Sequence, residues 1–191
     1  GSMKSWNRAA LPLLFAVGYL LTALLALYFT QGQDGIAAVW PPSGFFVAGL
    51  LYLEADRRKI LTIAVLAASM AANLYPGVSP IISVAYSAAN LIEGYLVFYL
   101  MGARERRPRL SEPVTLLRFA GAALAGGAVS AVLAGILSLN FSFVFLGSWA
   151  STVALGMLLV TPLIFFLLED PEGCPALLSF KSIWMLGVTV I

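Results

Sequence analysis

The sequence of 191 residues contains no histidine and only one cysteine, Cys174. Histidine is the commonest protein ligand for haem, zinc and copper, so its absence argues against a haem or metal sensor, and we expect neither metal nor cofactor. The same absence weakens an intramembrane hydrolase interpretation, because neither a Ser–His nor a metal–His arrangement is available. A lone cysteine also cannot form an internal disulfide.

Charged residues are scarce as well, at 10% of the chain, whereas hydrophobic residues make up 61% and the mean hydropathy is +0.95. A soluble domain carries about 25% charged residues, so this chain needs lipid. At about 20 apolar residues for each crossing, roughly six spans use nearly the whole length and leave no folded domain outside the bilayer. We therefore expect an all-α, polytopic integral membrane helical bundle.

Apolar segments separated by charged or Gly/Pro-rich residues mark the expected spans, at residues 9–30, 36–53, 60–74, 79–101, 114–139 and 143–168. A partial seventh segment begins near Ser182 and stops at Ile191, after about half the length of a crossing. We expect the chain to be cut there, inside a larger protein. Residues 1–3 resemble a tag remnant and a natural start, which leaves residues 4–191 as one transmembrane domain.

Basic residues fall on alternate loops, as the positive-inside rule requires. They are Lys4, Arg8, Arg57, Arg58, Lys59, Arg104, Arg106, Arg107, Arg109, Arg118 and Lys181. We expect a multi-pass protein of the bacterial cytoplasmic (inner) membrane with a cytoplasmic N-terminus. The opposite loops are short and carry only Asp34, so recognition must occur within or just above the bilayer.

One acidic residue, Glu93, lies deep in an expected span. A carboxylate there costs about 2.5 to 3.5 kcal/mol on insertion scales, so it needs a partner or a role. Tyr86 and Asn90 precede it at helical spacing and place three polar side chains on one face. This stripe is either a hydrogen-bonded clamp between helices or part of a ligand-binding or coupling site.

A second candidate feature is the stretch Trp40–Gly44 near the start of the second segment. Pro41 and Pro42 remove two amide donors, and irregular backbone in a membrane is tolerated only where protein or water satisfies it. The alternative is an interfacial tryptophan followed by an ordinary helix start with proline in its first turn.

With the orientation given above, several polar and aromatic side chains fall in or near the extracellular half of the membrane. They are Trp40, Pro41, Pro42, Ser43, Asn73, Tyr86 and Trp149, with Asn90 and Glu93 toward the middle. Such groups would line a small-ligand pocket if their helices converge. Small residues of the fifth segment, Gly121 to Gly135, favour either packing within the bundle or a homodimer contact.

These motifs resemble the first membrane-associated sensor (MASE) domain, the membrane input module of bacterial histidine kinases and diguanylate cyclases. The resemblance covers most of the chain and rests on four stretches. They are Trp40–Gly44, Ala72–Asn73, Asn90–Glu93 and the pattern from Trp149 through Ala154–Gly156 to Thr161–Leu163. Many members carry an acid where this chain has Val153, so a coupling role would fall to Glu93 alone.

The resemblance implies about eight helices followed by a cytoplasmic output domain, and signalling in place of transport. The expected partners are an unknown small-molecule ligand or a membrane partner protein, the lipid bilayer and, in the intact receptor, a second copy; no nucleic acid is expected. A small-solute transporter or a substrate-binding membrane component is the alternative, since six helices with one buried carboxylate also suit such a role. An enzyme ranks third, because no second acid, base or metal ligand accompanies Glu93 in the sequence.

The orientation can be tested with one engineered cysteine. With Cys174 replaced by serine, a cysteine at Ser111 should react with a membrane-impermeant maleimide only after the cytoplasmic face is opened, because all eleven basic residues would otherwise lie outside. Labelling of that cysteine in intact cells would contradict the orientation.

Overall fold

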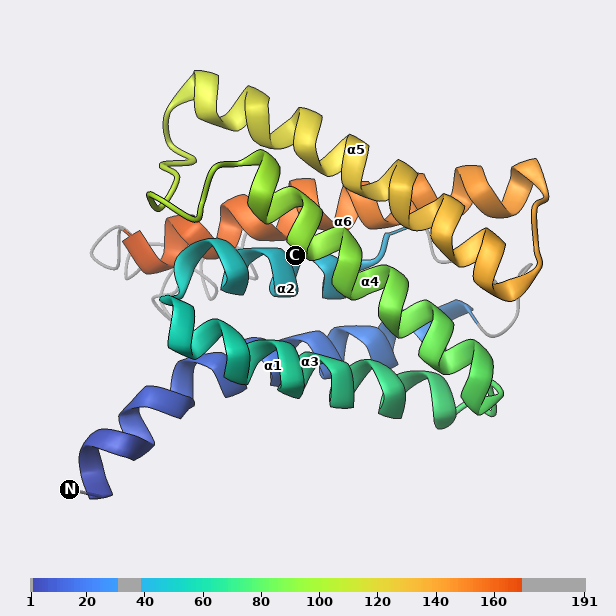
Figure 1. Ribbon diagram of the computed structural model, residues 1–191, viewed down its shortest axis with the longest axis horizontal. Helices are drawn as coiled ribbons and strands as arrows, with labels where there is room; N and C mark the ends of the chain where they lie inside the picture. The colour runs from blue at the N-terminus through green and yellow to red at the C-terminus, as the bar shows by residue number, and fades with distance from the viewer. Residues whose placement is uncertain (1, 31–38, 170–191) are drawn as a thin grey trace, which may run out of the picture.

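The computed structural model describes residues 2–30 and 39–169, with side chains from residue 9 to residue 29 and from residue 39 onward. Six α-helices make up most of these residues (Figure 1). They are α1 (Ser2–Thr30), α2 (Pro41–Tyr52), α3 (Ala55–Leu74), α4 (Pro80–Leu100), α5 (Pro113–Ser138) and α6 (Phe143–Glu169). The partial seventh segment at residues 182–191, together with Asp34, Cys174 and Lys181, lies outside the described residues.

The prediction of an all-α chain is confirmed, but the prediction of six complete spans is not. Four helices are long and apolar enough to cross a membrane: residues 9–29 of α1, and α4, α5 and α6. Helix α2 has 12 residues and a length of about 18 Å, against about 30 Å of hydrocarbon. Helix α3 has 20 residues, but Asp56 and three basic residues occupy its first turns.

Within the segment expected at residues 36–53, the structure describes residues 39–53, and helix α2 begins at Pro41, directly after Trp40 with φ −114° and ψ 80°. Pro41 and Pro42 then occupy the first two helical positions. An amide hydrogen at these positions has no partner within the helix, so its absence in proline costs no intrahelical hydrogen bond. The interpretation of this stretch as a helix start with proline in its first turn is therefore correct. That start lies inside the bundle, beside the middle of α6.

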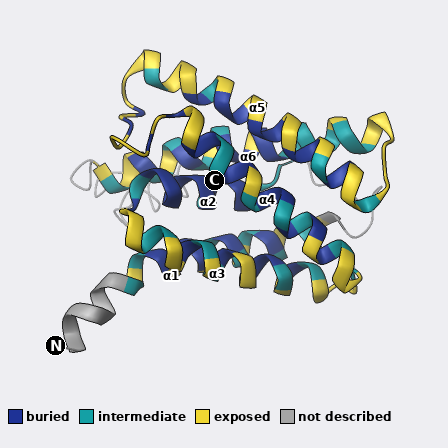
Figure 2. Cartoon of the chain, in the orientation of Figure 1, coloured by how far each residue is buried: buried dark blue, intermediate teal, exposed yellow. Residues whose placement is uncertain are grey.

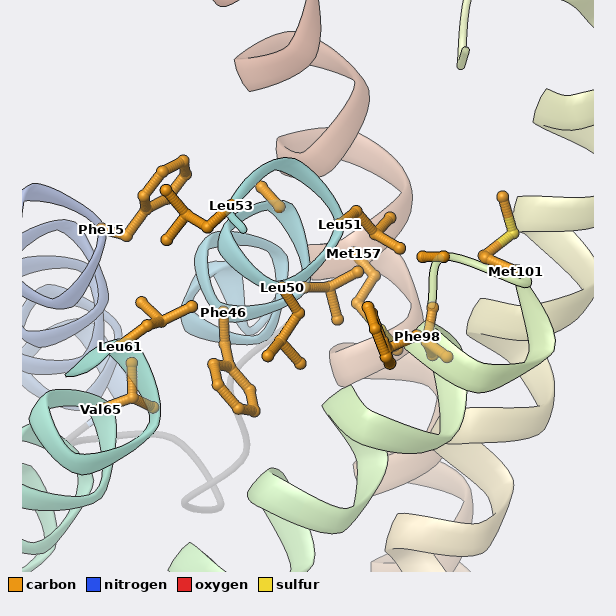
Figure 3. Packing of buried hydrophobic residues seen from close by; sticks show 14 of the residues in the cluster. Phe15, Phe46, Leu50, Leu51, Leu53, Leu61, Val65, Phe98, Met101 and Met157 are labelled. Atoms are coloured by element: carbon orange, nitrogen blue, oxygen red, sulfur yellow. The ribbon is translucent and has the colours of Figure 1, made fainter. Parts of the chain in front are cut away.

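Helix α2 is the centre of the bundle, with α1, α3, α4 and α6 packed around it (Figure 1). Most of its residues are buried, and the helix is mainly dark blue in Figure 2. Apolar side chains of the surrounding helices meet it on every side (Figure 3). They include Phe15 of α1, Leu61 of α3, Phe98 of α4 and Met157 of α6, against Phe46, Leu50 and Leu51 of α2. An apolar helix without a polar face is expected in such a buried position.

The outer surfaces of the bundle are apolar instead of polar. Leu14 of α1, Val114 of α5 and Phe143 of α6 are 65%, 80% and 93% exposed, respectively. Exposed residues follow the outer side of α5 along its length (Figure 2). Apolar exposure of this extent on four long helices fits a surface covered by lipid.

The basic residues of the described loops gather at one end of the bundle. This end holds the α2–α3 and α4–α5 connections and the last turn of α6, at the left of Figure 1. Helix α4 ends here with Gly102 at φ 65°, and the amide of Ala103 donates to the carbonyl of Phe98. This left-handed turn reverses the chain into the arginine-rich connection. The basic residues that occur on alternate loops in the sequence thus lie at a single end of the described molecule.

The close approach of α2 to α6 depends on glycines. The amide of Trp40 donates to the carbonyl oxygen of Thr152 at 2.9 Å, and the hydroxyl of Thr161 donates to the carbonyl oxygen of Gly44 at 2.9 Å. A side-chain carbon added at Gly156 would collide with the backbone carbonyl of Trp40, and one added at Gly44 would lie 2.5 Å from the carbonyl oxygen of Gly156. The two backbones therefore touch at this point.

We predict that Gly156→Ala destabilises the protein by about 1 to 3 kcal/mol, because the atom that its methyl group meets is backbone and cannot rotate away. Thermal unfolding in detergent, followed by size-exclusion chromatography, measures the effect. Gly147→Ala in the same helix is the matched control, since an added carbon there meets nothing within 4 Å. Equal melting temperatures for the two variants would contradict the close contact.

Candidate functional site

Seven polar side chains from five helices are buried together near the first turn of α2. We call this group the polar core. It consists of Tyr19 of α1, Ser43 of α2, Ser69 of α3, Ser87, Asn90 and Glu93 of α4, and Ser130 of α5. Each member is at most 5% exposed. In a bundle whose interior is mostly apolar, such a concentration of polar groups marks the place where function is most expected.

The carboxyl group of Glu93 is the centre of the polar core and is 1% exposed. The hydroxyl groups of Ser43 and Ser130 lie within interaction range of this carboxyl group, from α2 and α5. Gly126 lets α5 come this close to α4, because a carbon added there would lie only 2.8 Å from Cγ2 of Val97, one turn after Glu93. The prediction that the small residues of α5 permit close packing inside the bundle is confirmed at this position.

Two further hydrogen bonds join the helices around Glu93. The amide nitrogen of Asn90 lies 3.3 Å from the phenol oxygen of Tyr19, to which it donates across α4 and α1. The hydroxyl oxygens of Ser69 and Ser87 are 2.8 Å apart and link α3 to α4. The amide nitrogen of Asn90 thus ties α4 to α1, while the choice between a clamp and a ligand-binding or coupling site stays a prediction.

The polar core nevertheless contains polar atoms without a partner. Oγ of Ser43, Oδ1 of Asn90 and Oε2 of Glu93 are fully buried and make no hydrogen bond within the described part of the chain. Leaving a buried donor or acceptor unsatisfied costs about 1 to 3 kcal/mol, so three such atoms in one cluster are costly. These unpaired atoms give the polar core hydrogen-bonding capacity that its contacts between helices do not use.

Trp149 of α6 extends the polar core toward the other end of the bundle. Its indole nitrogen donates to the hydroxyl oxygen of Ser130 at 2.8 Å. Its ring lies 4.8 Å from that of Tyr86 and 5.6 Å from that of Phe145, centroid to centroid. These three partly buried rings form an aromatic cap that connects α4 and α6 beside the polar core.

The sequence-predicted site residues are brought together in part. Trp40, Pro41, Pro42 and Ser43 form the end of α2 that meets the polar core, with the indole of Trp40 within interaction range of Tyr19. Asn90 and Glu93 belong to the polar core, while Tyr86 and Trp149 form the aromatic cap. The convergence that the sequence left open is therefore seen for these residues.

Asn73 does not join the other predicted residues. Its side-chain amide donates to the backbone carbonyl of Ser69, one turn earlier in α3, at 2.9 Å. The hydroxyl of Ser69 takes its place in the polar core. Sequence reasoning missed Tyr19, Ser69, Ser87 and Ser130, because serine and tyrosine are common in membrane helices and carry no charge to draw attention. The spacing of Ser83, Ser87 and Asn90 along one face of α4 was the available signal.

Comparison with known proteins gives one positive result. The sequence model of the MASE1 family, the membrane-associated sensor domain of histidine kinases and diguanylate cyclases, matches residues 9–171. No curated protein and no solved structure matches the chain. The matched range includes every member of the polar core and both partners of the α2–α6 contact.

We predict that Ser130→Ala destabilises the bundle by about 0.6 to 1.7 kcal/mol, the range for hydrogen bonds between membrane helices, because it removes the acceptor for Trp149 and a neighbour of Glu93. Unfolding in mixed detergent and dodecyl sulfate micelles measures the change. Ser138→Ala in the same helix is the control, since that hydroxyl donates only to the carbonyl of Ala134 in its own helix. A loss in the control equal to the loss in Ser130→Ala would show that the inter-helix bond has no stabilising effect.

Proposed function

Because the chain belongs to the MASE1 family of membrane sensor domains, we propose that it is the input module of a bacterial signalling receptor. It detects a small ligand or a membrane partner protein within the bilayer and passes a helix rearrangement to a cytoplasmic output domain. The observation that carries this proposal is the set of unpaired buried acceptors around Glu93, at the first turn of a short helix in the centre of the bundle.

The chemistry of the polar core suits recognition better than catalysis. It holds one carboxyl group surrounded by hydroxyl and amide groups, and no group of three or more acidic, cysteine or histidine side chains in the described residues could hold a metal ion. Binding of a polar or cationic group would satisfy the free oxygens of Ser43, Asn90 and Glu93 at the same time. A ligand that pairs these atoms in only one helix arrangement would shift the bundle toward that arrangement.

Helix α2 is suited to relay the change, because its two ends contact both regions of interest. Its first turn places Ser43 beside Glu93, and its last turn reaches the basic end of the bundle. There, Nε of Arg58 donates to the carbonyl oxygen of Leu50 at 2.9 Å, and the guanidinium of Arg107 lies 4.0 Å from the ring centroid of Tyr52. A shift of α2 along its axis would therefore move two arginines that belong to the α3 and α4–α5 segments.

The proposed orientation places this basic end in the cytoplasm of a bacterial cell, at the inner membrane. Eight of the basic residues lie there in the described chain, and the opposite end has none among the described residues. An output domain on the cytoplasmic side would then adjoin the end of the bundle that Arg58 and Arg107 connect to α2. The relay would act over the length of one short, buried helix.

We predict that Glu93→Gln changes signal output by about fivefold or more while insertion and thermal stability stay near those of the unchanged receptor. Glutamine keeps the size and much of the hydrogen-bonding capacity of a protonated glutamate but carries no charge and no titratable proton. A fivefold change corresponds to about 1 kcal/mol in a two-state signalling equilibrium. Output is measured in a receptor in which this chain precedes its native output domain.

Glu54→Gln is the matched control, because Glu54 is exposed at the start of α3 and its side chain caps no amide. Asn90→Ala is expected to alter output together with a modest loss of stability, since it also removes the bond to Tyr19. Unchanged output in Glu93→Gln, or a loss of stability as large as its loss of output, would make the polar core a structural clamp. Solute uptake that depends on Glu93 would favour the transporter alternative.

A further inference from the structure

The basic end of the bundle contains a hollow of about 920 Å³, of whose arginines the proposed relay uses only Arg107. It lies between the end of α4, the α4–α5 connection, the start of α5 and the last turn of α6. Four arginines border it: Arg106, Arg107, Arg109 and Arg118. We call this feature the arginine hollow.

The chain around the arginine hollow is anchored. In the connection between α4 and α5, Ala103, Pro108 and Leu110 are buried, and the arginines between them are exposed. Ala103 and Leu110 belong to the main hydrophobic core. Arg118, in α5, is fixed by a hydrogen bond from its Nε to the carbonyl oxygen of Leu100 at 2.9 Å. This bond does not use the two terminal nitrogens of the guanidinium group. The guanidinium groups are thus carried on a fixed frame.

Internal carboxylates do not neutralise these arginines. Glu105, Glu112 and Glu169 also border the hollow, yet the only ion pair among the described residues is a 3.9 Å contact between Arg109 and Glu112, with the two side chains 75% and 58% exposed. An exposed pair at that distance contributes little. Arg106 and Arg118 have no carboxylate within 4.0 Å in the described chain. The hollow therefore presents guanidinium donors that an external anion could use.

We propose that the arginine hollow binds a phosphate-bearing anion through Arg106, Arg109 and Arg118. Planar guanidinium groups match phosphate oxygens two at a time, and three of them around one hollow can engage several oxygens of one phosphate group. With the orientation proposed above, the hollow lies at the level of the cytoplasmic headgroups, where anionic phospholipids attract basic residues. The phosphate belongs to such a headgroup or is free in solution, and the test below separates the two.

The test uses the whole chain, purified in neutral detergent and mixed with phosphatidylglycerol, phosphatidylcholine or inorganic phosphate. Native mass spectrometry counts bound lipid, and thermal unfolding detects bound phosphate. The site variant is Arg106→Gln with Arg109→Gln, two exposed residues whose replacement leaves the buried anchors intact. The control is Arg57→Gln with Lys59→Gln, which removes the same charge at the same end of the bundle but outside the hollow.

We expect phosphatidylglycerol to bind more tightly than phosphatidylcholine, and the site variant to lose at least fivefold more affinity than the control. A further variant, Arg118→Gln, should show the same selective loss even if it melts at a lower temperature. Saturation by inorganic phosphate in the absence of anionic lipid would assign the hollow to a soluble phosphate group. Equal losses in site and control variants would overturn the proposal, because general charge attraction would then explain all binding.

Discussion

The architecture depends on satisfying the backbone of a helix that begins inside a membrane bundle. In lipid, every buried amide and carbonyl needs a partner, and an interior helix start has no water to supply one. Pro41 and Pro42 lower the demand by removing two amide donors, and Trp40 donates its own amide to Thr152 of α6. Gly156 provides the space for that contact. With α2 held in this way, the helices around it have a common surface on which to pack.

The same placement explains why the polar groups meet. Because α2 starts at mid-bundle, Ser43 in its first turn comes to the side of Glu93, instead of lying at a membrane surface. A full-length second span would carry Ser43 away from this depth. The short helix also ends among the arginines of the opposite region, so one rigid element contacts both the buried carboxyl group and the basic loops. Membership of the MASE1 family of sensor domains gives this geometry its functional meaning.

Hydropathy was sufficient to predict the class of the chain and the positions of α1, α4, α5 and α6, since long apolar runs have few other structures in lipid. It could not predict the length of α2, because the apolar run continues on both sides of the proline pair and only the seating against Gly156 shows where the helix starts. Glu93 and Asn90 were predictable from their cost in a membrane. Tyr19 and Ser130 were not predictable, since their positions in the polar core depend on which faces of α1 and α5 turn toward α4. Asn73 does not join the polar core, because its side-chain amide hydrogen-bonds to the backbone of its own helix.

The contact between α2 and α6 also constrains how the protein is made. Gly44 and Thr161 are joined by a hydrogen bond across 117 residues of sequence, so α2 lacks part of its environment until α6 has been synthesised. At about 5 to 20 residues per second, that interval lasts from several seconds to about twenty. During this time a 12-residue helix too short to cross the membrane must pack against α1 and α3, which are synthesised before α6. The last described helix therefore completes the packing around α2.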